Sequence, residues 1–268
     1  MLNIHIIIPT YNRAHTIVES INSVIVQDYS DWKITIVDNN SSDGTEDIVK
    51  NKFKTLIGRK VIYKKFTETL PIIQNWNRAL NEIGDEKYFK LLWSDDTLEP
   101  NFLTTAVNQL ENLPENYVGF CSALNYVDLN TKHKFKVRKY GFYGAELWLS
   151  FFFKNALGSP TPQLLKTNFF KSLKFDINNR YAADMIYAAE PYFLGKRFAY
   201  CDFPLANLQT SAQTETGQIY GSELMITNRY DFREFVIKKF KYLRPILKIL
   251  SNFVYIAEKL FFKLSGHL

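Results

Sequence analysis

The sequence predicts an α/β protein with an open, mostly parallel sheet and helices on both faces. Over the first 125 residues, short apolar runs that suit buried parallel strands alternate with amphipathic segments that suit helices. Turn-forming residues, such as those of Asn39–Thr45, separate the two kinds of segment. The chain has 268 residues, of which 46% are hydrophobic, so it can bury a large core.

Repeated strand–helix–strand units organise the first half of the chain. Asn3–Ile8 is a continuous apolar run ended by Pro9, which is typical of a buried strand. His15–Val26 then carries apolar residues at helical spacing. The next expected elements are a strand at Trp32–Val37, a helix at Glu46–Phe53, a strand at Lys60–Lys64, a helix at Ile72–Ile83, a strand at Tyr88–Trp93, a helix at Asn101–Leu113 and a strand at Val118–Ala123. Such units join parallel strands through helical crossovers.

The pattern after residue 126 is less regular. The expected elements are a strand or hairpin arm at Lys132–Lys139, helices at Ala145–Phe153 and Ala182–Leu194, and a strand at Arg197–Cys201. No proline-rich or glycine-rich linker divides the chain. We therefore expect one main domain over residues 1–232, followed by a helical tail over 233–268.

The net charge of +6 lies in that tail. Residues 233–268 hold eight Lys or Arg and two acids. Residues 1–232 hold 25 Lys or Arg and 25 Asp or Glu, so their charges cancel. This confinement argues against a general nucleic-acid binder. A helix over 246–264 would collect its apolar residues on one face and lysines on the opposite face. Such a helix can pack on its own domain, join a homodimer or lie on an anionic membrane surface, and the charge favours the membrane.

Acidic residues follow two of the expected strands. Asp38 ends the second strand, and the pair Asp95–Asp96 follows the fourth. Loops at the carboxyl edge of a parallel sheet converge on ligands. Adjacent buried carboxylates need a cation, and a divalent ion that carries a diphosphate would supply one. Alternatively, Asp95 and Asp96 cap the helix that follows. The two cysteines and four histidines show no ligand spacing, which leaves carboxylates as the candidate metal ligands.

Four segments, in their order along the chain, resemble the family 2 glycosyltransferases of GT-A fold. They are IIIPTYNR (Ile6–Arg13), TIVDNNSSDGT (Thr35–Thr45), NWNRAL (Asn75–Leu80) and LLWSDDTLEPNFL (Leu91–Leu103). A looser similarity runs from Asp184 to about Thr214. The resemblance implies that residues 1–125 bind a nucleotide sugar and that residues 126–232 bind the acceptor.

The resemblance also implies roles for single residues. The implied nucleotide-binding residues are Pro9, Thr10, Tyr11, Arg13, Asp38, Arg78 and Asp95. Asp38 would accept a hydrogen bond from the base or ribose, and Arg78 would contact a phosphate. The alternatives are a turn carboxylate for Asp38 and a surface arginine for Arg78. Asp95, supported by Asp96, would hold Mn²⁺ or Mg²⁺, and Trp93 stands where the family more often has another carboxylate.

An inverting transfer also needs a base for the acceptor hydroxyl. The resemblance implies Asp184 at the start of a helix, although Ala183 replaces the usual preceding Glu. Glu190 is the alternative base. Asp184 can also be only a first-turn acid that the helix dipole favours.

Together with the basic tail, the resemblance implies an inverting hexosyl- or N-acetylhexosaminyltransferase. The donor would be a nucleotide-diphosphate sugar, with UDP expected, and the acceptor a glycan or a polyprenyl-linked glycan of a bacterial surface polysaccharide. The expected location is the cytoplasm, peripheral on the inner face of the membrane. A non-catalytic nucleotide- or membrane-binding protein on the same fold is the alternative, because Trp93 and Ala183 depart from the family pattern.

Overall fold

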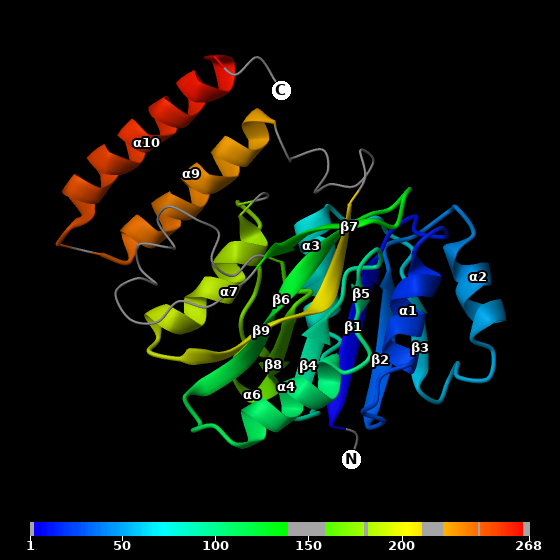
Figure 1. Cartoon of the computed structure of the whole chain (residues 1–268). Coiled ribbons are helices and arrows are strands. Elements are labelled where there is room, and N and C mark those ends of the chain that lie inside the picture. The colour runs from blue at the N-terminus through cyan, green and yellow to red at the C-terminus, as the bar shows by residue number, and fades with distance from the viewer. Residues whose placement is uncertain (1–2, 139–158, 180–181, 211–221, 241, 265–268) are drawn as a thin grey trace.

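The computed structural model describes residues 3–138, 159–179, 182–210, 222–240 and 242–264. Within these ranges nine strands form one sheet in the order β3-β2-β1-β4-β8-β6-β9-β5, and β7 pairs with β6 (Figure 1). The strands are β1 (Ile4–Thr10), β2 (Trp32–Asp38), β3 (Val61–Lys65), β4 (Tyr88–Leu91), β5 (Thr97–Leu98), β6 (Tyr117–Asp128), β7 (Lys134–Arg138), β8 (Gln163–Lys166) and β9 (Arg197–Thr210).

Helices connect and cover these strands. They are α1 (Ile17–Ile25), α2 (Thr45–Lys52), α3 (Ile72–Leu80), α4 (Phe102–Glu111), α6 (Thr167–Phe170), α7 (Ala183–Phe193), α9 (Glu223–Lys238) and α10 (Arg244–Leu264). The four strands β3, β2, β1 and β4 are parallel. β8 runs antiparallel between β4 and β6, and β6 and β9 are parallel again. The expected α/β class with a mostly parallel sheet is confirmed.

The direction of the crossovers changes beside β1. The chain moves from β1 to β2 and β3 on one side, and then returns to β4 on the other side of β1. Because such crossovers are right-handed, α3 lies on the opposite face of the sheet from α1 and α2. The carboxyl ends of β1 and β4 lie side by side at this point of the sheet. In open α/β sheets, a crevice at this switch point is the usual ligand site.

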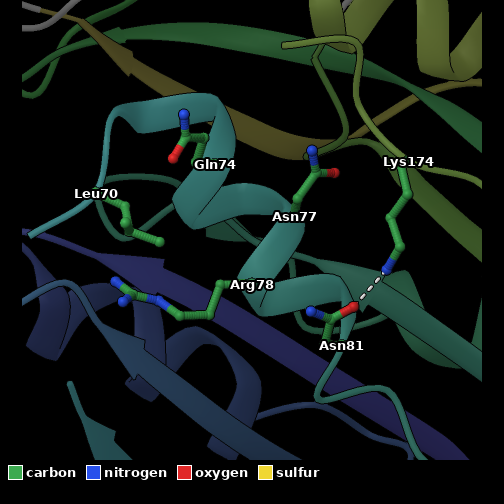
Figure 2. A pocket seen from close by; sticks show the side chains of 6 residues that line it. All are labelled: Leu70, Gln74, Asn77, Arg78, Asn81 and Lys174. Carbon is green, nitrogen blue, oxygen red and sulfur yellow. Dashed lines mark hydrogen bonds between the residues drawn. The ribbon is translucent and has the colours of Figure 1, made fainter. Parts of the chain in front are cut away.

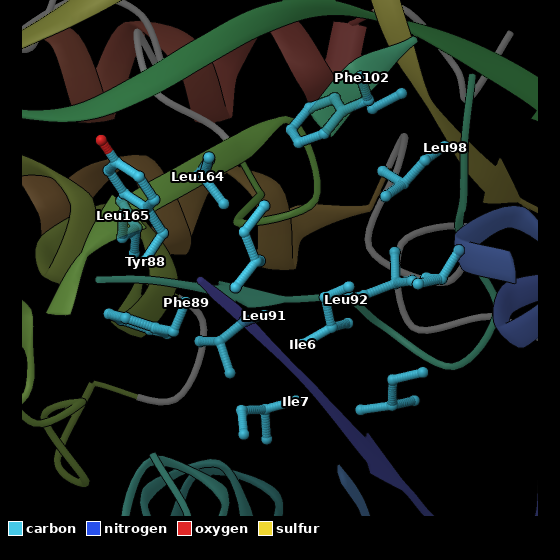
Figure 3. Close-up of a cluster of buried hydrophobic side chains, with 14 of the residues drawn as sticks. Ile6, Ile7, Tyr88, Phe89, Leu91, Leu92, Leu98, Phe102, Leu164 and Leu165 are labelled. Atoms are coloured by element: carbon cyan, nitrogen blue, oxygen red, sulfur yellow. The ribbon is translucent and has the colours of Figure 1, made fainter. Parts of the chain in front are cut away.

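The core explains why β1 shows no alternation of polar and apolar residues. All seven residues of β1 are buried, since helices cover both faces of the strand. Figure 3 shows Ile6 and Ile7 of β1 beside Leu91 and Leu92 at the end of β4. Packing of this kind fixes the depth at which each strand ends, and so the positions of the loops that follow.

The structure differs from the expected elements at several places. β9 continues well past the expected end at Cys201, through register shifts opposite β6, because pairing with β6 outweighs its polar composition. β4 ends at Leu91 rather than Trp93. The expected division between residues 232 and 233 falls inside α9, whose Phe232 and Val236 are buried in a cluster with residues of α7. The helix expected at Ala145–Phe153 lies outside the described residues.

His5 on β1 makes the stability of the fold depend on pH. Its buried ring accepts a hydrogen bond from the Gly84 N–H at Nδ1, and its Nε2 lies 2.8 Å from Thr35 Oγ1. Burial, together with the nearby Lys33 charge, lowers the pKa of His5 to about 4, although Glu86 opposes the shift. The unfolded chain therefore binds a proton at His5 more tightly than the folded chain does. The contribution of neutral, buried His5 to the free energy of unfolding is fully present above about pH 6.5 and is lost as the pH falls toward 4.

We expect His5 to account for a loss of roughly 2–3 kcal/mol in the free energy of unfolding between pH 7 and pH 4. Urea denaturation at several pH values measures this loss. His5→Gln, which keeps a side-chain amide able to donate to Thr35, should flatten the pH dependence over that window. An equal slope in the variant and the parent chain would contradict the assignment.

Candidate nucleotide-binding and catalytic site

The loop after β1 is fixed by hydrogen bonds to the segment after β2. Asn12 has a left-handed backbone, with φ of 51°, and its N–H donates to Ser41 Oγ at 2.9 Å. Ser42 N–H donates back to Asn12 Oδ1 at 2.9 Å. Arg13 N–H donates to Thr45 Oγ1 at 3.0 Å. The turn-rich segment recognised in the sequence thus serves as a scaffold for the loop.

The end of β1 offers groups that a ligand can use. Pro9 and Thr10 are the last strand residues, and Thr10 lies in register with Asp38 on β2. Thr10 is buried, and among the described residues its Oγ1 has no hydrogen-bond partner. An unsatisfied buried hydroxyl is costly, which favours a polar ligand or water at this place. Tyr11, the next residue, is 46% exposed and can pack against a flat ring.

Asp38 lies fully buried at the end of β2. Its Oδ1 accepts the Ser41 N–H at 3.0 Å and also the Ser41 hydroxyl. Its Oδ2 accepts the Tyr63 hydroxyl at 2.8 Å, and burial together with this hydrogen bond raises the pKa of Tyr63. An ionised carboxylate accepts up to about four hydrogen bonds. Asp38 therefore holds the loop and keeps acceptor capacity for one ligand donor.

Arg78 on α3 joins the segments after β2 and β3. Its guanidinium donates to Asn75 Oδ1 at 2.8 Å, to the Glu68 carbonyl at 3.1 Å and to Asn39 Oδ1. Asn39 in turn exchanges two hydrogen bonds of 2.9 Å with the backbone of Leu70. These contacts make Arg78 a residue that positions the loop after Asp38.

A cavity of about 410 Å³ runs along α3 beside Arg78. Figure 2 shows its lining: Leu70, Gln74, Asn77, Arg78, Asn81 and Lys174. The Arg78 side chain points toward Leu70, whereas Lys174 donates a hydrogen bond to Asn81 at the other end of the cavity. The cavity follows the polar side of α3.

The structure brings the loops after β1 and β4 together. Arg13 Nε lies 3.9 Å from Asp95 Oδ2, and the two side chains are 32% and 19% exposed. The Arg13 guanidinium also donates to the backbone carbonyl of Tyr11 at 3.3 Å. A guanidinium and a carboxylate thus face each other at the switch point, where the sequence places both.

Asp96 lies behind Asp95 and is buried. Its Oδ1 accepts the Gln209 N–H at 3.0 Å, and its Oδ2 accepts the Thr161 hydroxyl. Burial, and then the neighbouring Asp95 charge, raise the pKa of Asp96 well above its usual range. Asp96 therefore ties the end of β4 to the segment before β8 and to β9, and leaves Asp95 as the more exposed carboxylate of the pair.

A buried lysine completes this network. Lys90 on β4 is fully buried, and its Nζ donates to the carbonyls of Thr161 and Gln163, the latter at 3.0 Å. Burial lowers the pKa of Lys90 to about 7, although the Asp96 charge opposes the shift. Each of these buried groups therefore makes the charged form of the other less costly.

The carboxylates after β4 suit a divalent cation that binds together with a diphosphate. Within the described ranges, no group of three His, Cys, Asp or Glu side chains could hold a metal. Asp95 faces Arg13 and is partly exposed, whereas both oxygens of Asp96 accept hydrogen bonds from the protein. Mg²⁺ commonly binds through one or two carboxylates plus substrate phosphates. The donor set therefore fits a divalent ion shared by Asp95 and a diphosphate.

Asp184 lies in the first turn of α7. Its Oδ1 accepts the Met185 N–H at 2.8 Å, and the preceding Ala183 is buried. Glu190, the other candidate base, forms an ion pair with Lys239 at 2.7 Å. This ion pair directs Glu190 toward the end of α9.

A line of aromatic rings connects α7 with the end of β4. Tyr187 of α7 stacks on Phe175 with a centroid distance of 4.4 Å, and Phe175 meets Trp76 edge-on at 5.3 Å. Trp76 stacks on Trp93 at 4.5 Å. Trp93, which takes the place of a family carboxylate, thus packs the acidic turn of β4 against α3.

The sequence did not identify several residues that build the site. They are Asn39, Tyr63, Lys90, Thr161 and Gln209. A lysine inside the apolar run Tyr88–Leu92 was a readable signal, because a buried cation needs partners. The others act through contacts between distant segments, which no local pattern records.

The fold and the site define an α/β protein with a polar loop and acidic strand ends around a switch point. The sequence model of Glycosyl transferase family 2 matches residues 5–181, which is more than half of the chain. The chain therefore belongs to this family. The GT-A fold expected from the resemblance is confirmed.

Individual proteins agree with the family match. An uncharacterized glycosyltransferase of Mycoplasma pneumoniae, the MG060 homolog, is 26% identical over 205 residues, which cover 73% of this chain and 64% of that protein. The UDP-Glc:α-D-GlcNAc-diphosphoundecaprenol β-1,3-glucosyltransferase WfgD of Escherichia coli is 48% identical over 42 residues, or 16% of this chain and 17% of that protein. The chain thus spans less than two thirds of each relative.

A solved structure shows the same fold. Staphylococcus aureus TarS 1–349 in complex with UDP-GlcNAc superposes with a TM-score of 0.67 at 17% identity. The superposition covers 88% of this chain and 66% of TarS 1–349. At this identity the likeness establishes the fold alone.

The hydrogen bonds of Asp38 lead to a prediction with two variants. Asp38→Ala should lower the affinity for UDP at least tenfold, about 1.4 kcal/mol, and should also lower the melting temperature, because Ser41 and Tyr63 lose their acceptor. Tyr63→Phe keeps the carboxylate, so we expect a stability loss of about 1 kcal/mol with UDP affinity nearly unchanged. Calorimetric titration and thermal unfolding measure the two effects. Unchanged UDP affinity in Asp38→Ala would remove Asp38 from the site.

Proposed function

We propose that this chain is an inverting glycosyltransferase that moves a hexose or N-acetylhexosamine from a UDP-sugar to a glycan acceptor on a lipid carrier. The observation that carries the proposal is the approach of Arg13 to Asp95 at the switch point, in a chain of Glycosyl transferase family 2. Retention of Asp184 favours this activity over a non-catalytic nucleotide-binding role. The name of the E. coli relative, which gives a UDP-glucose donor and a diphosphoundecaprenol acceptor, supports the choice of substrates.

The donor would lie across the carboxyl ends of β1 and β2. Tyr11 would pack against the base, and the remaining acceptor capacity of Asp38 would take a base N–H. The Thr10 hydroxyl would gain the partner that it lacks among the described residues. Arg78 would contribute by holding Asn39 and the loop behind Asp38. A base without a donor at that point would leave one acceptor position of the buried carboxylate unfilled, which provides selectivity.

The diphosphate would lie between Arg13 and Asp95. Arg13 would bind phosphate oxygens directly, because its guanidinium already faces Asp95 and is partly exposed. Asp95 would hold Mn²⁺ or Mg²⁺, with Asp96 fixing the turn from behind. When bound, the cation neutralises negative charge on the departing nucleoside diphosphate. Sugar transfer then requires that the acceptor oxygen attack the anomeric carbon from the face opposite the leaving group.

Asp184 would accept the proton of the acceptor hydroxyl as its oxygen attacks. Its place in the first turn of α7 is rigid, because Tyr187 one turn later is locked in the aromatic line that reaches Trp93. A positioned carboxylate of this kind supplies general-base catalysis. Trp76 and Trp93 would thereby keep the base and the acidic turn of β4 in a fixed relation.

The metal assignment can be tested at Asp95. In the parent chain, Mn²⁺ should raise the affinity for UDP, and Asp95→Asn should abolish that increase while UDP alone still binds. Asp85→Asn is a matched control, because Asp85 lies before β4, at its amino end, with a side chain that is 94% exposed. Calorimetry with and without Mn²⁺ gives the comparison. Full sugar transfer in excess chelator would refute the metal requirement.

The base assignment can be tested by comparing two acids of α7. Asp184→Asn should leave UDP affinity near the parent value and lower turnover by roughly 10²–10⁴-fold, because only proton transfer is lost. Glu190→Gln, which removes the acid paired with Lys239, should turn over within a few-fold of the parent. Steady-state transfer assays measure both. Normal turnover in Asp184→Asn would reduce Asp184 to a first-turn acid of the helix.

A further inference from the structure

Helix α10 packs on α9 through its polar face. Glu258 accepts ion pairs from Arg229 at 2.9 Å and from Arg233 at 3.0 Å, and the Arg233 side chain is only 1% exposed. Lys248 pairs with Glu234 at 2.8 Å. The charged residues of the tail helix are therefore used largely within the α9–α10 pair.

The apolar face of α10 points to solvent. Its members are strongly exposed: Ile246 67%, Ile249 72%, Phe253 70%, Ile256 57% and Leu260 56%. The exposed stripe continues into the turn before the helix, where Tyr242 is 91% and Leu243 52% exposed. Figure 1 shows α10 as the outermost layer, with α9 between it and α7. A surface helix normally buries such a face, so an exposed stripe of this length marks an interaction surface.

The positive charge of residues 233–268 favours an anionic lipid surface over a second copy of the chain as the partner of this stripe. Residues 233–268 carry eight Lys or Arg against two acids, so two copies joined through α10 would bring two positive segments together. An anionic lipid surface has the complementary sign. Lys238 and Arg244 are exposed on either side of Tyr242, at the turn that continues the stripe. Tyrosine beside basic residues is typical of the membrane–water interface.

We propose that α10 lies in the plane of an anionic membrane, with its apolar stripe at the boundary between headgroups and acyl chains. The ion pairs with α9 then face the water side, where they need no further partner. No helix in the described ranges combines the length and apolar character needed to cross a bilayer, which accords with a helix that lies on the surface. Membrane binding stands without the proposed function, whereas its use, bringing the crevice to a lipid-linked acceptor, rests on that function.

Co-sedimentation of the full chain with vesicles tests the proposal. We expect binding to vesicles of phosphatidylcholine mixed with phosphatidylglycerol, and weaker binding to phosphatidylcholine alone. Phe253→Glu, which places a charge in the stripe, should lower the apparent affinity at least tenfold. Phe203→Glu is the matched control, because Phe203 on β9 is 74% exposed, close to the 70% of Phe253. It should bind as the parent does.

A second variant measures the electrostatic contribution to vesicle binding. Lys238→Glu combined with Arg244→Glu should weaken binding to the mixed vesicles several-fold and reduce its salt dependence, because fewer cations face the lipid. Circular dichroism and thermal unfolding check that each variant folds. UDP affinity, measured in parallel, should stay at the parent value in all of them, since none lies in the crevice.

Three results would overturn the proposal. The first is an absence of parent binding to the mixed vesicles at low salt. The second is parent-like binding of Phe253→Glu. The third is a concentration-dependent dimer in sedimentation velocity that Phe253→Glu dissolves, which would assign the stripe to a second copy. Loss of UDP binding or transfer with intact vesicle binding would instead refute the proposed function and leave the membrane surface standing.

Discussion

The change of crossover direction beside β1 is the constraint on which the site depends. It places β1 between β2 and β4, so the loops after all three strands leave the same edge of the sheet. Each loop needs its own support. The β1 loop obtains it from the polar segment after β2, and the acidic turn after β4 obtains it from Thr161 and Gln209. Arg13 and Asp95 meet because both supports are rigid.

The network that supports the acidic turn after β4 contains two buried ionisable groups, Lys90 and Asp96, and burying such groups costs free energy. Burial moves the pKa of Lys90 down and the pKa of Asp96 up, and each charge partly offsets the shift of the other. Removing one alone would leave the other as an uncompensated buried group, and would strand the carbonyl oxygens or the N–H that it satisfies. A purely apolar substitute could pack as well, but it could not accept the Gln209 N–H. The network therefore fixes where β9 meets the acidic turn.

The sequence predicted the elements whose cause is local. β1 and β2 follow from apolar runs, and the placement of Asp38 and Asp95 at strand ends follows from where those runs stop. The roles of Arg78 and Asp96 could not be inferred in the same way. Arg78 donates to acceptors far away in sequence, such as Asn39, and Asp96 faces inward only because Thr161 and β9 reach it. Such contacts depend on pairing between segments, which periodicity does not record.

Helix α10 is a second case in which periodicity along the sequence does not determine the contacts of a segment. The period of α10 was readable, since its apolar and charged residues separate at helical spacing, but period alone leaves open which face turns inward. That choice depends on α9, which presents Arg229, Arg233 and Glu234 to the helix and so pairs with its charged side. Apolar burial would ordinarily outweigh a few ion pairs at a surface, because an exposed pair contributes at most about 1 kcal/mol. The Arg233–Glu258 pair is an exception, since Arg233 is almost wholly buried and loses its partner if α10 rotates. The buried Arg233 guanidinium therefore holds α10 with its apolar stripe facing outward. That stripe in turn requires an apolar environment on its outer side, such as the acyl region of a membrane.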